Sequence, residues 1–269
     1  MIDSHVHFWR LDRGDYHWLT PARTKVYRDF LPGDLLNSDL NGVIAVQAAP
    51  TMQESKWLLR QASQHSWIKG VTGWVDLRAP TVANDVIDLR ASGNLVGLRP
   101  MEAVGNDTWL DASDYQLGLE VVASEELVLE ALVLPHHLPA VTRVAQSYPG
   151  LPILINHAAK PRLDLFVTWK AAMHDAAACP NVSCKFSGLT AQSMDFAFNQ
   201  SVFDTIWSAF SSERILWGSD YPVLLETADY DAWVELAFRL TAECSDTEKQ
   251  AVFETNAMRV YHLQQGEIT

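Results

Sequence analysis

Cysteine is scarce in this sequence. Its 269 residues include three, Cys179, Cys184 and Cys244, and no two of them have the Cys-x-x-Cys spacing of redox or zinc motifs. Disulfide-stabilised secreted domains need regularly spaced pairs, which this chain does not have. All three cysteines lie among apolar residues, so we expect reduced thiols packed in the core of a cytoplasmic protein.

Basic clusters and long apolar runs are also missing. The chain has 20 Lys and Arg residues against 33 Asp and Glu residues, a formal net charge of -13. Such a charge repels nucleic acids and anionic lipids unless a local basic stripe overcomes it. No segment reaches the roughly 18 consecutive apolar residues of a membrane span, and the N-terminus has the pattern of a strand rather than of a targeting signal. We therefore expect neither nucleic acid nor membrane as a partner.

Short apolar runs alternate with amphipathic stretches along the whole chain. Hydrophobic residues make up 48% of the sequence and charged residues 20%, which is enough apolar material for a large core. Eight runs have the length and composition of buried strands, and eight longer segments have helical character. The strands are predicted at 2–8, 43–49, 68–77, 95–100, 127–133, 152–158, 182–188 and 215–220, and the helices at 53–65, 83–91, 111–124, 136–148, 163–178, 196–210, 230–241 and 247–262.

This alternation of strands and helices predicts an α/β fold. Right-handed crossovers between such units give a parallel sheet. Eight units favour closure into a (β/α)₈ TIM barrel over an open doubly wound sheet, and no glycine-rich phosphate loop follows the first run. We expect a single domain over residues 1–269, since such barrels commonly reach about 250 residues. Ser245 and Glu248 have capping-box spacing at the start of the last helix.

His5 and His7 stand two residues apart in the first predicted strand. Side chains at this spacing point to the same face of a strand. Neutral imidazoles suit zinc and similar divalent ions, and a catalytic site of this kind is completed by a carboxylate. Asp220 closes the apolar run 215–220 just before a proline turn and is the candidate carboxylate. For the histidine pair taken alone, two hydrogen-bonded histidines without a function remain the alternative.

Polar residues gather where the predicted strands end. In a barrel of this type the active site lies at the C-terminal ends of the strands. Burying a polar group there without a partner costs several kcal/mol, which favours a shared site over separate structural roles. For Gln47 and Asp76, capping or packing at the barrel rim is the alternative. The polar residues in question are His5, His7, Gln47, Asp76, Arg99, Glu130, His157, Lys185 and Asp220.

Several short motifs together resemble a known family. They are His5-Val6-His7, Gly97-Leu98-Arg99-Pro100, Asn156-His157-Ala158-Ala159-Lys160-Pro161, Cys184-Lys185-Phe186-Ser187-Gly188, Gly218-Ser219-Asp220-Tyr221-Pro222, and Asn256-Ala257 followed by Arg259 and Tyr261. The sequence is similar over its whole length to the amidohydrolase-related metal-dependent hydrolases. Within that family it resembles the branch of sugar-lactone hydrolases typified by L-fuconolactonase and L-rhamnonolactonase.

The resemblance implies a catalytic set and a cofactor. His5, His7, His157 and Asp220 are the implied metal-binding and catalytic residues, with Lys185 as a further catalytic residue near the substrate. Two-metal members of the superfamily also need a bridging lysine or glutamate and an additional histidine on a middle strand. We therefore expect one divalent cation, zinc before others, and catalysis without a metal stays open as the alternative.

Three other residues bear on the question of a second ion. Glu130 is a partial substitute for the bridging residue. His136 and His137 follow Pro135 at a helix start, where capping or surface roles are expected.

The implied reaction is hydrolysis of a sugar-acid lactone to the open-chain acid. Asp220 is the expected general base for water, because a carboxylate beside imidazoles stays ionised. Arg99 offers a planar fork of donors for ring hydroxyls or a carboxylate. Trp9 and Trp18 flank a segment rich in aromatic and polar residues, which we expect to form a lid over the sugar ring. A plain plug of the barrel mouth is the alternative for each tryptophan.

Other functions on the same scaffold stay open. One is hydrolysis of a carboxylated ring lactone, and another is a non-oxidative decarboxylase. A non-catalytic barrel that binds a small molecule is the more distant alternative, against which the retained acid and base groups argue. The sequence does not select the sugar, the ring size or the oligomeric state.

Overall fold

The computed structural model describes residues 1–35, 39–101 and 109–263. Within these residues eight strands form one sheet in the order β1 to β8, and each neighbouring pair is parallel. Beyond β8, Tyr221 forms a parallel bridge with Val6 of β1, so the predicted (β/α)₈ barrel is confirmed. The strands are β1 (Ile2–Val6), β2 (Gly42–Val46), β3 (Ile68–Gly73), β4 (Leu95–Leu98), β5 (Val128–Ala131), β6 (Ile153–Ile155), β7 (Val182–Phe186) and β8 (Ile215–Trp217).

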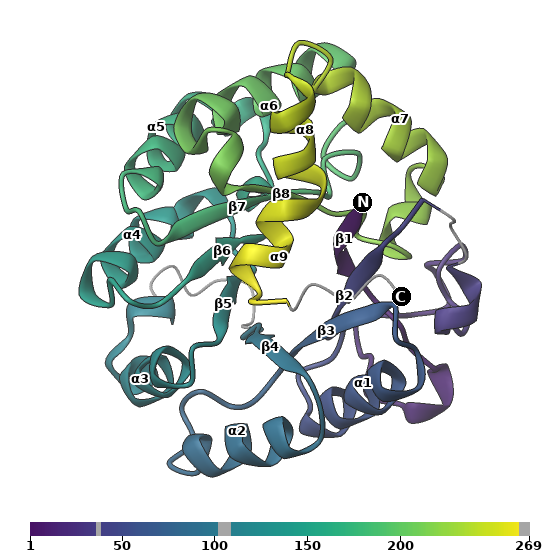
Figure 1. The fold of residues 1–269 in the computed structure, drawn as a ribbon, viewed down its shortest axis with the longest axis vertical. Helices are drawn as coiled ribbons and strands as arrows, with labels where there is room; N and C mark the ends of the chain where they lie inside the picture. Colours follow the sequence, from purple (N-terminus) through teal and green to yellow (C-terminus); the bar gives the residue numbers. More distant parts are fainter. Residues whose placement is uncertain (36–38, 102–108, 264–269) are drawn as a thin grey trace.

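Seven helices surround the described strands, and two shorter ones cross an end of the barrel (Figure 1). The surrounding helices are α1 (Met52–Gln64), α2 (Val82–Ala91), α3 (Gln116–Ser124), α4 (Leu138–Ser147), α5 (Phe166–Ala177), α6 (Phe196–Phe210) and α7 (Tyr230–Leu240). Most agree with the predicted segments to within a few residues. The predicted starts at 111, 136 and 163 differ, because 3-10 turns precede α3, α4 and α5 there.

The last predicted helix is interrupted. It consists of α8 (Asp246–Gln250), a π-helical turn at Ala251–Thr255 and α9 (Asn256–Val260). The predicted capping box is present, since Ser245 Oγ accepts the N–H of Glu248 and the Glu248 carboxylate accepts the N–H of Ser245 over 2.8 Å.

The interior of the barrel is apolar at the end where the strands begin, and α9 closes this end. Ala257, Val260 and Tyr261 pack there against strand residues. The strand residues in this cluster are Ile2, Ile44, Val46, Val96, Val128, Leu154 and Leu216. Because α9 fills the end at which the strands begin, the opposite end, where they terminate, is left for a site.

A buried carboxylate fixes the end of β2 against α1. Glu54 on the first turn of α1 accepts the N–H groups of Ala48 and Ala49 over 3.0 and 2.7 Å. Thr51 caps the same helix by accepting the N–H of Glu54 over 3.1 Å. Burial raises the pKa of Glu54 to about 7. These bonds hold the backbone directly after Gln47 in place.

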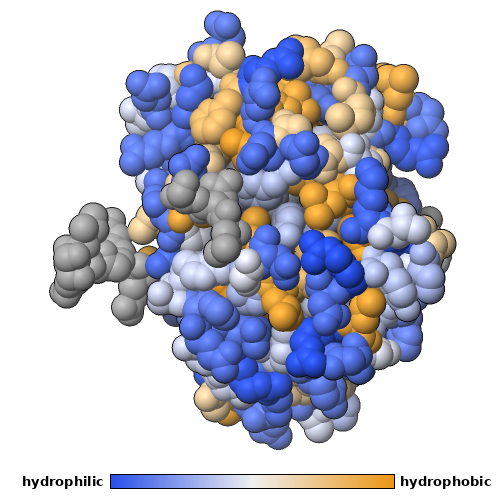
Figure 2. All heavy atoms as spheres, turned by 90° about the vertical axis from the view of Figure 1, so that its right-hand side faces the viewer, coloured by the Kyte–Doolittle hydropathy of each residue, from blue (hydrophilic) through white to orange (hydrophobic). Residues whose placement is uncertain are grey.

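The face in Figure 2 carries polar and charged residues over most of its area, with smaller apolar areas between them. In the described parts of the chain, none of the helices has both the length and the apolar character needed to cross a membrane. All three cysteines are free thiols; Cys179 and Cys184 are buried as predicted, whereas Cys244 is only partly buried.

Candidate active site

His5 and His7 lie together at the end of β1. The pairing of β1 with β2 shifts register between Asp3 and Val6, just where His5 stands. Both histidines are buried, and their ring centroids are 4.9 Å apart. His7 Nδ1 lies 2.8 Å from the carbonyl oxygen of Val46 on the neighbouring strand. A carbonyl can only accept, so Nδ1 carries the proton and Nε2 presents its lone pair when the ring is neutral.

Asp220 faces both of these histidines from the segment after β8. Its N–H donates to the carbonyl oxygen of His5 over 2.9 Å, and this bond joins the first strand to the segment after the last strand. Asp220 Oδ1 lies 3.2 Å from His7 Nε2, 3.6 Å from His5 Nε2 and 3.7 Å from His157 Nε2. Three imidazole nitrogens therefore converge on one carboxylate oxygen. We call these four residues the imidazole cluster.

His157 reaches the cluster from a strained turn after β6. Four consecutive residues, His157 to Lys160, have φ between 48° and 57°. Each costs about 1 to 2 kcal/mol relative to a right-handed conformation. His157 Nδ1 lies 2.8 Å from Ser187 Oγ. Gly188 leaves room for the ring, because a Cβ there would lie 2.7 Å from His157 Nδ1.

The cluster combines neutral imidazoles with an ionised carboxylate. Burial lowers the pKa of His157 to about 3 and also lowers the pKa values of His5 and His7. Burial alone would raise the pKa of Asp220, but its interactions with His157 and His7 and the positive charge of Arg99 together outweigh burial, so that pKa is lowered. At neutral pH the carboxylate therefore faces the lone pair of His7 Nε2.

Beneath His5 lies a set of buried polar residues, which we call the lower polar layer: Thr72, Glu130, Asn156, Lys185 and Tyr261. Both oxygens of Glu130 are occupied by donors. Thr72 Oγ1 and Asn156 Nδ2 each donate over 2.8 Å, Lys185 Nζ donates over 2.7 Å, and the Tyr261 hydroxyl also donates. Burial raises the pKa of Glu130, but the Lys185 charge and the hydrogen bonds from Lys185, Tyr261 and Asn156 together outweigh it, so that pKa is lowered. Glu130 is therefore a counter-ion within the barrel, not the bridging residue suggested by its position in the sequence.

Lys185 lies deeper than the sequence suggested. Its side chain is fully buried, and Nζ donates to Glu130 and lies 3.1 Å from His5 Nδ1. Burial lowers the pKa of Lys185 to about 8. His5 stands between Lys185 and Asp220, since its Nδ1 lies 3.1 Å from Lys185 Nζ and its Nε2 lies 3.6 Å from Asp220 Oδ1. Lys185 is placed to orient His5.

Arg99 and Gln47 form one wall of the site at the ends of β4 and β2. Gln47 Nε2 donates to the carbonyl oxygen of Arg99 over 2.8 Å, and Arg99 Nη2 donates to the carbonyl oxygen of Gln47. Arg99 Nη1 lies 3.4 Å from His5 Nε2. Arg99 Nε and Gln47 Oε1 are buried and make no hydrogen bond in the described structure. Both atoms retain capacity for a bound molecule.

The two predicted lid tryptophans differ in their surroundings. Trp9 is fully buried, and its Nε1 donates to the carbonyl oxygen of Arg28 over 2.7 Å. Trp18 is only partly buried, and its Nε1 donates to the carbonyl oxygen of Ala48 over 2.7 Å. The Arg23 guanidinium lies 4.7 Å from the Trp18 ring centroid. Trp18 therefore has surface to offer a ligand, whereas Trp9 supports it from behind.

Asp76 lies outside the imidazole cluster. Strand β3 ends at Gly73, because the N–H of Trp74 donates to Ser55 Oγ over 2.8 Å instead of to a neighbouring strand. Asp76 falls in the following turn, where its carboxylate accepts the N–H of Arg78 over 3.0 Å and is half exposed. The structure thus gives Asp76 the capping role that the sequence left open.

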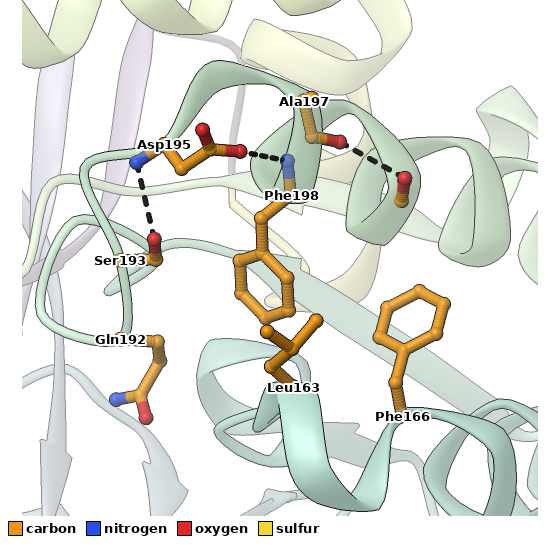
Figure 3. Close-up of a pocket in the computed structure, with 8 residues that line it drawn as sticks. Leu163, Phe166, Gln192, Ser193, Asp195, Ala197 and Phe198 are labelled. Carbon is orange, nitrogen blue, oxygen red and sulfur yellow. Dashed lines mark hydrogen bonds between the residues drawn. The ribbon is translucent and has the colours of Figure 1, made fainter.

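A groove of about 560 Å³ lies apart from this cluster, at the start of α6 (Figure 3). Leu163, Phe166 and Phe198 form its apolar side. Asp195 accepts the N–H of Phe198 over 2.7 Å, and Ser193 accepts the N–H of Asp195 over 3.1 Å. These polar groups are used in starting the helix, so the groove brings together no catalytic set among the described residues.

The donor set of the imidazole cluster fits a divalent cation. One ligand atom each from His5, His157 and Asp220 lie within 4.8 Å of one another. The lone pair of His7 Nε2 also faces the ionised Asp220, and two acceptors at 3.2 Å attract each other only through a cation or a shared proton. Imidazole nitrogen and carboxylate oxygen are typical zinc ligands. The fit agrees with the sequence prediction of a metal site here.

Comparison with known proteins places this barrel in a family. The amidohydrolase family model matches residues 2–263. The chain belongs to the amidohydrolase family. A relative from Burkholderia ambifaria named L-fucono-1,5-lactonase is 33% identical, with 97% of this chain and 95% of the relative covered. A protein of the same name from Burkholderia multivorans is 32% identical, with 97% and 96% covered.

A solved amidohydrolase shows the same architecture. The crystal structure of an amidohydrolase from Burkholderia multivorans with bound zinc superposes with a TM-score of 0.92 at 32% identity, covering 98% of this chain and 99% of that one. The similarity spans the barrel from end to end, and the amidohydrolase fold predicted from sequence motifs is confirmed.

Two features of this amidohydrolase barrel escaped the sequence reasoning. Tyr261 was noted only as part of a terminal motif, yet its hydroxyl enters the barrel and binds Glu130. Ser187 was noted only beside Gly188, yet it contacts His157. A signal for Tyr261 did exist, because it follows Ala257 and Val260 on the buried side of the last helix.

Proposed function

We propose that this protein hydrolyses a sugar-acid lactone to the open-chain sugar acid. The observation that carries the proposal is the convergence of three imidazole nitrogens on the ionised Asp220 at the C-terminal end of a barrel. Relatives named L-fucono-1,5-lactonase, similar along almost the whole chain, support a sugar lactone as the substrate. Lactone hydrolysis needs an activated water and a polarised carbonyl, and the site has groups for both.

Each residue of the site has a part in the proposed reaction. Asp220 accepts a proton from water as the water oxygen bonds to the lactone carbonyl carbon. The protonated Asp220 then returns the proton to the ring oxygen when the ester bond breaks. Arg99 Nε and Gln47 Oε1 are free to bind ring hydroxyls, and the exposed part of Trp18 offers a flat surface to the apolar face of the sugar.

A zinc-type ion would be held by Asp220 together with His5, His7 and His157. When bound, such an ion lowers the pKa of water and polarises carbonyl oxygens. His7 and His157 present Nε2 toward Asp220. Their Nδ1 atoms contact the carbonyl oxygen of Val46 and the hydroxyl of Ser187, respectively, and such contacts orient metal-binding histidines in many proteins.

We predict at most one tightly bound ion per chain. A second ion would need a bridging carboxylate or lysine, and Glu130 and Lys185 are already engaged with each other over 2.7 Å. Elemental analysis of protein purified with added zinc checks this expectation, and removal of the ion by a chelator is expected to abolish turnover until zinc is restored. Two ions per chain would contradict it. Undiminished activity in a protein without metal would instead assign the histidines to hydrogen-bonding roles.

The proposed function is tested by a screen of lactones. Proton release is measured for a series of aldonolactones of five- and six-membered rings, with Asp220→Asn protein as the control for spontaneous hydrolysis. Enzyme-dependent hydrolysis of at least one sugar lactone supports the proposal. Turnover confined to carboxylated ring lactones, or release of carbon dioxide from aromatic acids, would replace it with one of the alternatives that the sequence left open.

We predict that Arg99→Met changes selectivity. The substitution keeps much of the stem but removes five donors. The ratio of kcat/KM for a hydroxylated lactone to that for an unsubstituted lactone is expected to fall by at least roughly tenfold, as expected from the loss of one charged hydrogen bond. An equal decrease on both substrates would show that Arg99 serves the carbonyl or supports the barrel.

A further inference from the structure

An ion pair joins the segment between β1 and β2 to the segment after β8. Arg23 Nε donates to Glu226 Oε1 over 2.8 Å, and Arg23 Nη2 donates to Glu226 Oε2 over 2.5 Å. One guanidinium thus engages both oxygens of the carboxylate, and this paired geometry fixes its direction as well as its distance. Lys25 Nζ also donates to the carbonyl oxygen of Glu226, over 3.2 Å. Glu226 ends a 3-10 turn that follows Asp220 closely in the chain.

The same guanidinium lies against Trp18. The central carbon of the Arg23 guanidinium is 4.7 Å from the Trp18 ring centroid, which is within the range of a cation–π contact. Trp18 Nε1 donates to the carbonyl oxygen of Ala48 over 2.7 Å. Trp9 packs edge to face with Trp18, with ring centroids 5.5 Å apart. These contacts hold the Trp18 ring in one orientation, and the contact with Arg23 depends in turn on Glu226.

Trp18 lies close to the imidazole cluster and to the wall that carries unpaired polar atoms. Trp9 links it to the cluster, since the ring centroids of Trp9 and His7 are 6.5 Å apart. Ala48, which binds Trp18, directly follows Gln47, whose buried Oε1 makes no hydrogen bond in the described structure. Trp9 is fully buried and Trp18 only partly, so Trp18 is the one of the two rings that a bound molecule can touch.

We infer that Glu226 is a positioning residue for sugar recognition, whose carboxylate holds Arg23 against Trp18 in the orientation that receives the sugar ring. The inference rests on the proposed function. The indole packs on the apolar face of the sugar and takes no part in the proton transfer at Asp220. A ring that is already fixed in its binding orientation loses less conformational entropy when the ligand binds. Loss of the ion pair should therefore weaken binding of sugar lactones without slowing the chemical step.

Substitutions at both partners of the ion pair test this assignment. Glu226→Gln keeps one acceptor oxygen but removes the charge, and Arg23→Met removes the donors. We expect KM for the best sugar lactone to rise about threefold to tenfold in both variants, because a side chain must then be ordered on binding. The value of kcat should stay within about twofold of the wild type, as for an interaction made equally in the ground state and the transition state. KM for an unsubstituted lactone should change by less than about twofold, since such a ring has no sugar face to recognise.

A double-mutant cycle shows whether Glu226 acts through Trp18. Trp18→Ala should raise KM for the sugar lactone at least as much as Glu226→Gln does. Adding Glu226→Gln to Trp18→Ala should then raise KM no further, because the ring that the carboxylate positions is gone. Effects that add would show that the ion pair supports the barrel independently of Trp18.

Glu125→Gln is the matched control. Arg90 Nη1 donates to Glu125 over 3.0 Å just before β5, at the end of the barrel away from the site, and Glu125 is 33% exposed against 28% for Glu226. The control should leave kcat and KM as in the wild type, and the melting temperature of Glu226→Gln should change no more than that of the control. Wild-type KM in Glu226→Gln, a fall in kcat on both classes of lactone, or additive effects in the cycle would overturn the inference while the proposed function stands. A wild-type protein that hydrolyses no lactone would overturn both.

Discussion

Replacing Asp220 by asparagine is expected to abolish lactone turnover while leaving the barrel folded. Asparagine has nearly the same shape and tolerates the φ of 63° found at this position better than most residues do. Its amide cannot accept the proton of water, and loss of a general base costs on the order of a hundredfold or more. Turnover is measured at neutral pH beside a thermal unfolding curve.

Asp164→Asn is the matched control for this change. Asp164 pairs with Arg162 on the surface, so the same loss of charge there should leave turnover unaltered. An Asp220→Asn protein with near-normal turnover and a normal melting curve would remove Asp220 from the mechanism.

The second large effect is expected for stability. Lys185→Met should lower the free energy of unfolding by about 3 to 5 kcal/mol, because it leaves the buried carboxylate of Glu130 without its counter-charge. Denaturant unfolding at neutral pH measures the change.

The double variant Lys185→Met with Glu130→Gln separates charge from packing. With neither charge present, most of the lost stability should return, since the desolvation of the carboxylate is removed as well. If the double variant is as unstable as Lys185→Met, packing of the lysine stem is the larger contribution. If the double variant is stable but inactive, the contact of Lys185 with His5 serves the reaction.

The imidazole cluster was predictable because it depends on strand ends. The parallel strands of a barrel all end on one side, so His5, His7, His157 and Asp220 meet there even though they are far apart in sequence. Arg99 and Gln47 follow the ends of β4 and β2 on this same side, where they bond to each other. The prediction needs only the order of the strands and the position of each residue along its strand.

Depth within the barrel was not predictable in this way. Lys185 lies inside β7 rather than beyond its end, and its partner Glu130 draws the ammonium beneath His5. Asp76 lies outside the imidazole cluster because a hydrogen bond from Trp74 to Ser55 of α1 ends β3 at Gly73. The sequence around Asp76 contains no indication of this contact between a helix and the end of a strand. The left-handed turn at His157 contains no glycine, so nothing in its sequence indicates its backbone conformation.

The pairing of β1 with the segment after β8 also bears on how the protein acquires activity. His7 and Asp220 are separated by 213 residues. They meet only when the segment after β8 pairs with β1 and closes the barrel. Contacts so distant along the chain have the largest entropic cost of closure and tend to form late. In a partly folded chain with most of its helices formed, Asp220 would therefore not yet contact His5 and His7. We therefore expect newly made or refolding molecules to become competent only once this closure has formed.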